Sequence, residues 1–204
     1  MYKLGLFFAG ALSVVAVTSI AAGVFLSGAH GFSAREPPSP LERWAARRAR
    51  QFALPAGARK RPNPVPGSAD VLAEARAHWA DHCAACHANN GSGDVEMGKH
   101  LYPPAPDMRL QETQRMSDGE LFFIIQNGIR LTGMPAWGGG SQHDEQDSWK
   151  LVHFIRHLPQ LTAAEEREMG TLNPKSPGEL REEQEEKEFL NGGPSHEHAQ
   201  HQHH

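Results

Sequence analysis

Cysteine is scarce in this chain, since its 204 residues include only two. Two thiols cannot build a disulfide-rich scaffold or supply a four-thiolate zinc or iron–sulfur site within one chain. Aromatic residues make up 7% and hydrophobic residues 39% of the sequence, which is little for one compact globule of this length. The net charge of −4 excludes a strongly basic nucleic-acid-binding protein on bulk charge. Strand patterns are also missing, because no alternation of apolar and polar residues runs for a useful length.

The charge is unevenly distributed along the chain. Residues 1–34 carry only Lys3, and the net charge is +6 over 35–68, −5 over 69–160 and −6 over 161–204. Only the third of these segments mixes apolar and polar positions densely enough to bury a core. The predicted organisation is a transmembrane anchor at 1–29, a Pro/Arg-rich linker at 30–68, one folded domain at 69–160 and an acidic tail at 161–204.

The N-terminal segment from Leu4 to Ala29 has 26 residues without a formal charge. As a helix it would be about 39 Å long, enough to cross a hydrocarbon core of about 30 Å. A cleaved signal peptide is the alternative, because Ser27, Gly28 and Ala29 provide small residues for cleavage. The apolar run is longer than the roughly 7–15 residues of a signal-peptide core, so we predict an uncleaved anchor.

The linker at 30–68 contains seven prolines, which predict a semi-extended spacer. Within it, residues 41–52 could form a short basic helix, in which Trp44 and Phe52 suit a membrane interface. A solvated basic linker explains the same residues equally well. The arginines here also conflict with export of the following domain, because the positive-inside rule would place them in the cytoplasm.

The most informative segment is the motif Cys83-Ala84-Ala85-Cys86-His87. Two thiols at this spacing can each add to one vinyl group of a haem, and the adjacent histidine can supply an axial nitrogen to the iron. We therefore predict one covalently attached haem c. A redox disulfide of the thioredoxin type is one alternative, although the flanking sequence lacks the βαβ pattern that it requires. A zinc site is another, with further ligands from His78, His82 or His100.

The iron needs either a sixth ligand or an open position, and Met134 is the candidate ligand. Gly133 and Pro135 would hold this methionine in an extended loop, and its soft thioether sulfur would stabilise ferrous iron. The other candidates are methionines expected to fill the core and histidines with competing nitrogens: Met97, Met108, Met116, His100, His143 and His153. The aromatic residues that could line the ring are Trp79, Tyr102, Phe122 and Trp137.

Three helices are predicted in the domain, at 69–82, from the Ser117–Glu120 capping box to residue 126, and at 142–158. Two more capping boxes, at 162–165 and 176–179, predict helices in the tail. The tail ends in a histidine-rich tract that either binds a transition metal or is a bland polar end. Its histidines are His196, His198, His201, His203 and His204.

Residues 69–160 resemble the class I c-type cytochromes, and look closest to domains of cbb3-type oxidase subunits and membrane-anchored bacterial cytochromes. The resemblance lies in the cysteine–histidine motif, Tyr102-Pro103-Pro104, the 127–137 segment and an aromatic last helix. It implies an all-α bundle around one haem, with Cys83 and Cys86 attaching it and His87 and Met134 as its axial ligands. It also implies that Pro103 or Pro104 accepts a hydrogen bond from the proximal histidine, and that a small residue, here Ala75, lies where the first helix crosses the last.

The same resemblance implies a function and a location. Haem of this type is attached on the outer face of the bacterial cytoplasmic membrane, so the domain is expected in the periplasm. We expect an electron carrier and not an enzyme, tethered by about 39 residues, with a quinol-oxidising complex or a dehydrogenase as donor and a terminal oxidase as acceptor. Because the domain is acidic, partners with basic docking patches are favoured. The alternatives are a fixed haem subunit of an oxidoreductase, a haem sensor or peroxidase-like enzyme with an open iron site, and metal handling by the tail.

Overall fold

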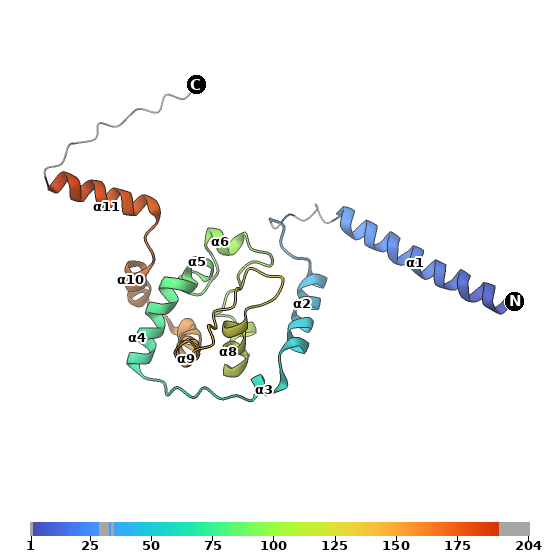
Figure 1. Ribbon diagram of the computed structural model, residues 1–204, viewed down its shortest axis with the longest axis horizontal. Helices are drawn as coiled ribbons and strands as arrows, with labels where there is room; N and C mark the ends of the chain where they lie inside the picture. The colour runs from blue at the N-terminus through green and yellow to red at the C-terminus, as the bar shows by residue number, and fades with distance from the viewer. Residues whose placement is uncertain (1, 29–32, 34, 192–204) are drawn as a thin grey trace, which may run out of the picture.

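The computed structural model describes residues 2–28, 33 and 35–191, and every regular element in this part of the chain is a helix (Figure 1). The predicted all-α class is therefore confirmed. The N-terminal half contains α1 (Tyr2–Gly28), α2 (Pro40–Ala53), α3 (Ala56–Arg59), α4 (Ala69–His78), a π-helix (Trp79–Cys83), α5 (Ala84–His87) and α6 (Glu96–Lys99). The remainder contains α7 (Gln111–Gln114), α8 (Asp118–Asn127), α9 (Gln142–His157), a 3-10 turn (Leu158–Gln160), α10 (Ala163–Leu172) and α11 (Pro177–Leu190).

The core of the domain lies where α4 and α8 pack against α9. Phe122 and Trp149 stack with their ring centroids 4.0 Å apart and nearly parallel planes. Ala75 is buried on α4, as the close approach of α4 and α9 requires. The predicted capping box at the start of α8 forms, since the Ser117 hydroxyl accepts from the Glu120 amide and the Glu120 carboxylate accepts from the Ser117 amide. These contacts fix the scaffold on which the site is built.

Helix α1 is long and apolar enough to cross a membrane, and the span that meets this criterion is Lys3–Val24. The side chains of this span are exposed and contribute nothing to the core. An exposed helix of this composition suits a hydrocarbon environment better than water. The structure thus contains the predicted N-terminal apolar helix.

Residues 35–68, which we call the strap, differ from the predicted semi-extended spacer. Part of the strap is helical, because the prolines at 40 and 55 stand at helix starts, where a missing amide hydrogen costs nothing. Helix α2 begins with a capping box in which the Ser39 hydroxyl accepts from the Glu42 amide. The short basic helix that the sequence allowed at 41–52 is therefore present, with Leu41, Trp44 and Phe52 exposed.

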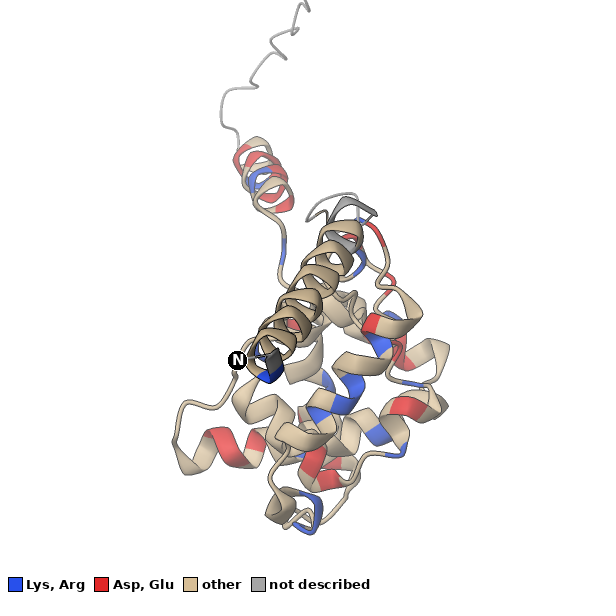
Figure 2. Ribbon diagram, turned by 90° about the vertical axis from the view of Figure 1, so that its right-hand side faces the viewer, with Lys and Arg blue, Asp and Glu red and all other residues tan. Residues whose placement is uncertain are grey.

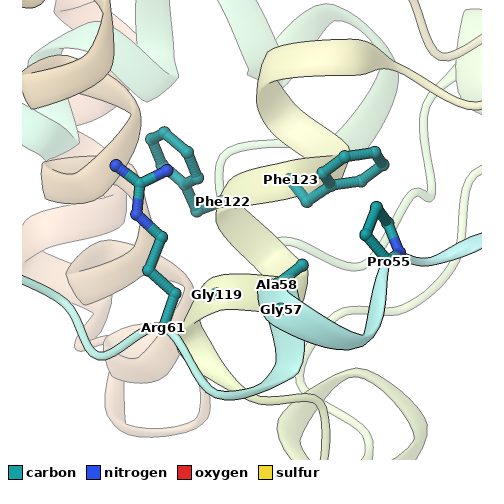
Figure 3. Close-up of a pocket in the computed structure, with 7 residues that line it drawn as sticks. All are labelled: Pro55, Gly57, Ala58, Arg61, Gly119, Phe122 and Phe123. Carbon is teal, nitrogen blue, oxygen red and sulfur yellow. The ribbon is translucent and has the colours of Figure 1, made fainter.

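The C-terminal half of the strap is attached to the domain by its side chains. The Arg61 guanidinium lies over the rings of Phe122 and Trp149, at 4.7 and 5.3 Å from their centroids. Figure 3 shows Arg61 beside Phe122, with α3 close to α8. The Asn63 side-chain amide donates to the Trp149 carbonyl at 3.0 Å, and His153 Nε2 contacts the Val65 carbonyl oxygen at 2.8 Å. This half of the strap is thus packed against the domain and is not a free spacer.

The first part of the acidic tail also belongs to the domain. Helix α10 begins at the predicted Thr162–Glu165 capping box and buries Met169 completely. Arg76 of α4 pairs with Glu165 at 3.2 Å and with Glu168 at 3.0 Å. Helix α11, which begins at the second predicted capping box, is largely exposed and rich in acidic residues (Figure 2). The histidine-rich tract at 196–204 lies outside the described residues.

Candidate functional site

The cysteine–histidine motif lies at the end of a continuous helical path through α4, the π-helix and α5. The sequence predicted one helix to residue 82, but the chain changes to π geometry over Trp79–Cys83. A π turn is wider than an α turn and is frequent at functional sites. Trp79 is buried and donates from its indole nitrogen to the Ala88 carbonyl at 3.0 Å, which anchors the chain on both sides of the motif.

Helix α6 packs directly on the backbone of the motif, and this is possible because residue 98 is glycine. A methyl group at Gly98 would collide with the carbonyl oxygens of Cys86 and Gly93. The Gly93 amide in turn donates to the His87 carbonyl at 2.9 Å. The segment after the motif therefore contacts the backbone of Cys86 through Gly98 and that of His87 through Gly93.

His87 is 8% exposed, and its ring lies 5.8 Å from the ring of Trp79, measured between centroids. Burial lowers the pKa of His87 to about 4, so the imidazole is neutral at physiological pH, the form that binds metals. Its Nδ1 is buried without a hydrogen-bond partner among the described residues. The hydrogen bond expected from His87 to Pro103 or Pro104 is therefore not formed in this structure, although both prolines line the adjoining cavity.

Both cysteines are free and half-buried. Burial raises the pKa of the Cys83 thiol to about 12, with a smaller contribution from the nearby Cys86. A reactive thiol of the thioredoxin type has a lowered pKa, which the Cys83 environment does not provide. The redox-disulfide alternative thus lacks both the strands and the electrostatics that it needs within the described residues.

Met134 lies in a loop that is fastened to the end of α8. The Ile129 amide donates to the Met134 carbonyl at 3.1 Å, and the Met134 amide donates to the Thr132 hydroxyl at 3.1 Å. Gly128 has a φ of 64° and approaches the backbone of residues 134–136 so closely that a methyl group would collide with it. Such a fixed loop can hold one side chain in a defined position.

One cavity of about 530 Å³ is lined by all four predicted site residues, Cys83, Cys86, His87 and Met134. Most of the remaining wall on the domain side is apolar, and includes Leu101, Pro103, Pro104, Ala105, Ile129 and Trp137. The volume falls within the range of cofactor pockets, about 300–1,000 Å³. Two thiols, a neutral imidazole and a thioether, set in an apolar wall, are the groups that a covalently held haem requires. The residues present therefore fit haem c.

The other candidate ligands lie away from this cavity. Met108 and Met116 pack against the core and Met97 is exposed. The His100 and His143 side chains are mostly exposed, at 60% and 79%, and His153 contacts the strap. Tyr102 and Trp137 do line the cavity, whereas Phe122 stacks on Trp149 and Trp79 lies behind His87. For zinc, no group of three or more His, Cys, Asp or Glu side chains within the described ranges is arranged to hold an ion.

The sequence analysis missed several charged residues that line the cavity. Arg43, Arg47 and Arg50 come from α2, and Glu112 comes from α7. His82 also lines it, with its ring edge-on to Trp137 at 5.5 Å between centroids. A capping box at Ser39–Glu42 would have predicted α2 itself, but no local signal shows that α2 lies across the cavity.

A comparison with protein families gives a match over residues 70–155 to the family described as cytochrome C oxidase, cbb3-type, subunit III. No curated protein matches the chain. The matched segment begins in α4 and ends in α9, so it contains the motif, the methionine loop and the helical core. Residues 70–155 are therefore a cytochrome c domain of the cbb3-type oxidase subunit III family.

Proposed function

We propose that this protein is a membrane-anchored cytochrome with one haem c, which carries single electrons between membrane redox complexes. Cys83 and Cys86 attach the haem, and His87 and Met134 are the axial ligands. The observation that carries the proposal is that a single apolar cavity is lined by all four of these side chains. When bound, haem c supplies one-electron chemistry between ferric and ferrous iron.

The site residues favour a carrier over an enzyme. If His87 and Met134 both bound the iron of a haem, they would leave it no site for a substrate. The thioether of Met134 stabilises the reduced state more than a second imidazole would, which raises the reduction potential. The apolar wall excludes water and favours the reduced state further, because burial disfavours the additional positive charge of the oxidised one.

The anchor and the strap keep this site close to a membrane. The segment between the end of α1 and the start of α2 is residues 29–39, eleven residues in all. A chain of this length spans at most about 40 Å. The tether is therefore much shorter than the expected 39 residues, because α2 is joined to the domain through Tyr102 and Glu112 and the following residues pack on it. We propose that the domain faces the periplasm, with a quinol-oxidising complex or a dehydrogenase as donor and a terminal oxidase as acceptor.

The short tether also favours a second candidate function, that of a fixed haem subunit of an oxidoreductase complex. A carrier that swings between separate complexes gains from a long tether, whereas a fixed subunit does not need one. The family description, which names an oxidase subunit, supports this reading. Purification in mild detergent distinguishes the two: a fixed subunit remains with its complex at high salt, and a carrier dissociates.

The test of the proposed function is a haem-stained denaturing gel, followed by ferric and ferrous absorption spectra of the exported full chain. We expect haem to survive denaturation and the spectrum to show a methionine–iron band. Met134→Ala should abolish that band, whereas Met97→Ala should keep it, because Met97 is exposed and outside the cavity. Absence of covalent haem would refute the proposal. Haem without the band in the wild type would move the distal ligand away from Met134.

A further inference from the structure

We propose that the strap completes the haem site: Arg43, Arg47 and Arg50 of α2 bind the two propionate carboxylates of the haem. This inference rests on the proposed function, because it requires haem c attached at Cys83 and Cys86. It assigns a cofactor-binding role to a helix that lies outside the matched family domain, which begins at residue 70.

The cavity is divided by polarity into two walls. The domain side is formed mainly by apolar side chains together with the attaching and ligating residues. Four of the five Asp, Glu, Lys and Arg residues that line the cavity come from α2, and the fifth is Glu112. A haem has the same division, because its ring is apolar and its two carboxylates lie on one edge.

The three arginines share one face of α2. Positions 43, 47 and 50 are separated by four and three residues, the spacing that places side chains on the same side of a helix. Ala46, on the same face, also lines the cavity. Arg48 lies outside this face and does not line the cavity. Helix α2 therefore presents three guanidinium groups to the cavity, whereas the guanidinium group of Arg48 lies on another face of the helix.

These arginines outnumber the carboxylates available to them. Arg47 lies 3.1 Å and Arg50 3.9 Å from the Glu112 carboxylate, so the two share one partner. Arg43 donates to the Pro38 carbonyl at 2.8 Å, which neutralises no charge. Glu42 is already occupied, since it accepts from the Ser39 amide at 2.7 Å and from the Tyr102 hydroxyl at 3.0 Å. Three arginines against Glu42 and Glu112 give the charged residues of the cavity a net charge of +1, and Arg43 has no carboxylate partner among the described residues.

The orientation of the haem follows from its attachment. Cys83 and Cys86 take the vinyl groups, and the propionates lie on the edge of the ring away from the vinyls. Figure 1 shows α5, which carries Cys86 and His87, and α2 on opposite sides of the loops that follow α6 and α8. A haem attached at Cys83 and Cys86 would carry its two carboxylates on the edge away from the cysteines, and the α2 arginines line the same cavity. Guanidinium groups suit this task because their planar forks bind carboxylates through two parallel hydrogen bonds.

The test compares single substitutions in the full-length haem protein, purified in detergent. Arg43→Gln, Arg47→Gln and Arg50→Gln each remove one positive charge from the cavity wall, and Arg48→Gln removes the same charge from another face of α2. The readouts are the propionate bending bands in the resonance Raman spectrum and the midpoint potential. We expect the first three to shift the propionate bands and lower the potential, because a positive charge near the iron disfavours the ferric state. Arg48→Gln should leave both readouts close to wild type.

A second variant tests a change of the midpoint potential in the opposite direction. Glu112→Gln removes the carboxylate that competes for Arg47 and Arg50, so the potential should rise and the propionate bands should again shift. Unchanged propionate bands in all three cavity variants, or equal shifts in Arg48→Gln, would overturn the inference. A haem-stained gel separates this failure from that of the proposed function. If haem is covalently bound and the bands do not move, only the role of α2 is wrong, whereas absence of covalent haem refutes both.

Discussion

The Tyr102 hydroxyl donates a hydrogen bond of 3.0 Å to the Glu42 carboxylate, which joins the wall of the cavity to the first turn of α2. Both residues line the cavity, although 60 positions separate them in the sequence. The Ser39 side chain, the Ser39 amide and the Tyr102 hydroxyl together lower the pKa of Glu42, so it is ionised at neutral pH. The Glu42 carboxylate therefore both caps α2 and joins this helix to Tyr102 in the cavity wall.

Removal of this carboxylate should loosen the strap. In Glu42→Ala, α2 loses half of its capping box and its contact with Tyr102, so we expect several-fold faster hydrogen exchange of the α2 amides. Glu36→Ala is the matched control, because Glu36 is an exposed strap residue that precedes the helix. Exchange measured by mass spectrometry checks this prediction. Equal rates in the two variants would show that α2 is held by other contacts.

The helices of the domain could be predicted from the sequence because their signals are local. The capping boxes at Ser117, Thr162 and Ser176 all form, and α9 begins at the predicted residue. The seven prolines of residues 30–68 predict an extended spacer, whereas part of this segment is helical. Ser39-Pro40-Leu41-Glu42 has the same form as the tail box at Ser176, and would have predicted α2.

The composition of the site could be predicted more completely than its surroundings. The spacing of Cys83, Cys86 and His87 and the environment of Met134 are local features, and all four residues line one cavity. The arginine face of α2 depends on where a helix docks after some 30 residues of intervening chain, which no local pattern specifies. The π turn over Trp79–Cys83 likewise has no local signal in the sequence.

Gly98 should be intolerant of any side chain. A methyl group there would collide with two backbone carbonyls, those of Cys86 and Gly93, and backbone cannot move aside as a flexible side chain can. We expect Gly98→Ala to destabilise the protein by about 1–3 kcal/mol and to reduce haem attachment. Gly170→Ala is the control, because it lies in α10 with open space around it and should be neutral or stabilising by up to about 1 kcal/mol. Urea unfolding checks both, and equal stabilities would refute the close packing of α6 on the motif.

The docking of α10 should weaken in acid. Burial alone would raise the pKa of Glu165, but hydrogen bonds from the Thr162 amide and hydroxyl and from His157 outweigh it and lower the pKa to about 2. Since this value lies below the ordinary 4.5, the ionised Glu165 stabilises the fold above about pH 4.5, and this contribution is lost as the pH falls towards 2. We expect wild type to lose about 1–2 kcal/mol more over this range than Glu165→Gln does.

Thermal unfolding at several pH values measures this difference. Glu185→Gln is the control, since this substitution removes the same charge from an exposed position on α11. Its stability should change with pH as that of wild type does. If Glu165→Gln also follows wild type, the contacts of Glu165 with Thr162 and His157 do not contribute to stability.

The anchor should be separable from the haem domain. The side chains of residues 3–24 are exposed, so deletion of this span removes nothing from the core. When a cleavable export signal replaces it, we expect the protein to move from the membrane fraction to the soluble periplasmic fraction with an unchanged haem spectrum. The intact mass of the wild-type protein should include residues 1–28, because the apolar run is longer than a signal-peptide core. A mature wild-type chain that begins near residue 30 and fractionates as soluble would contradict the anchor. In that case residues 29–39 would have no tethering role.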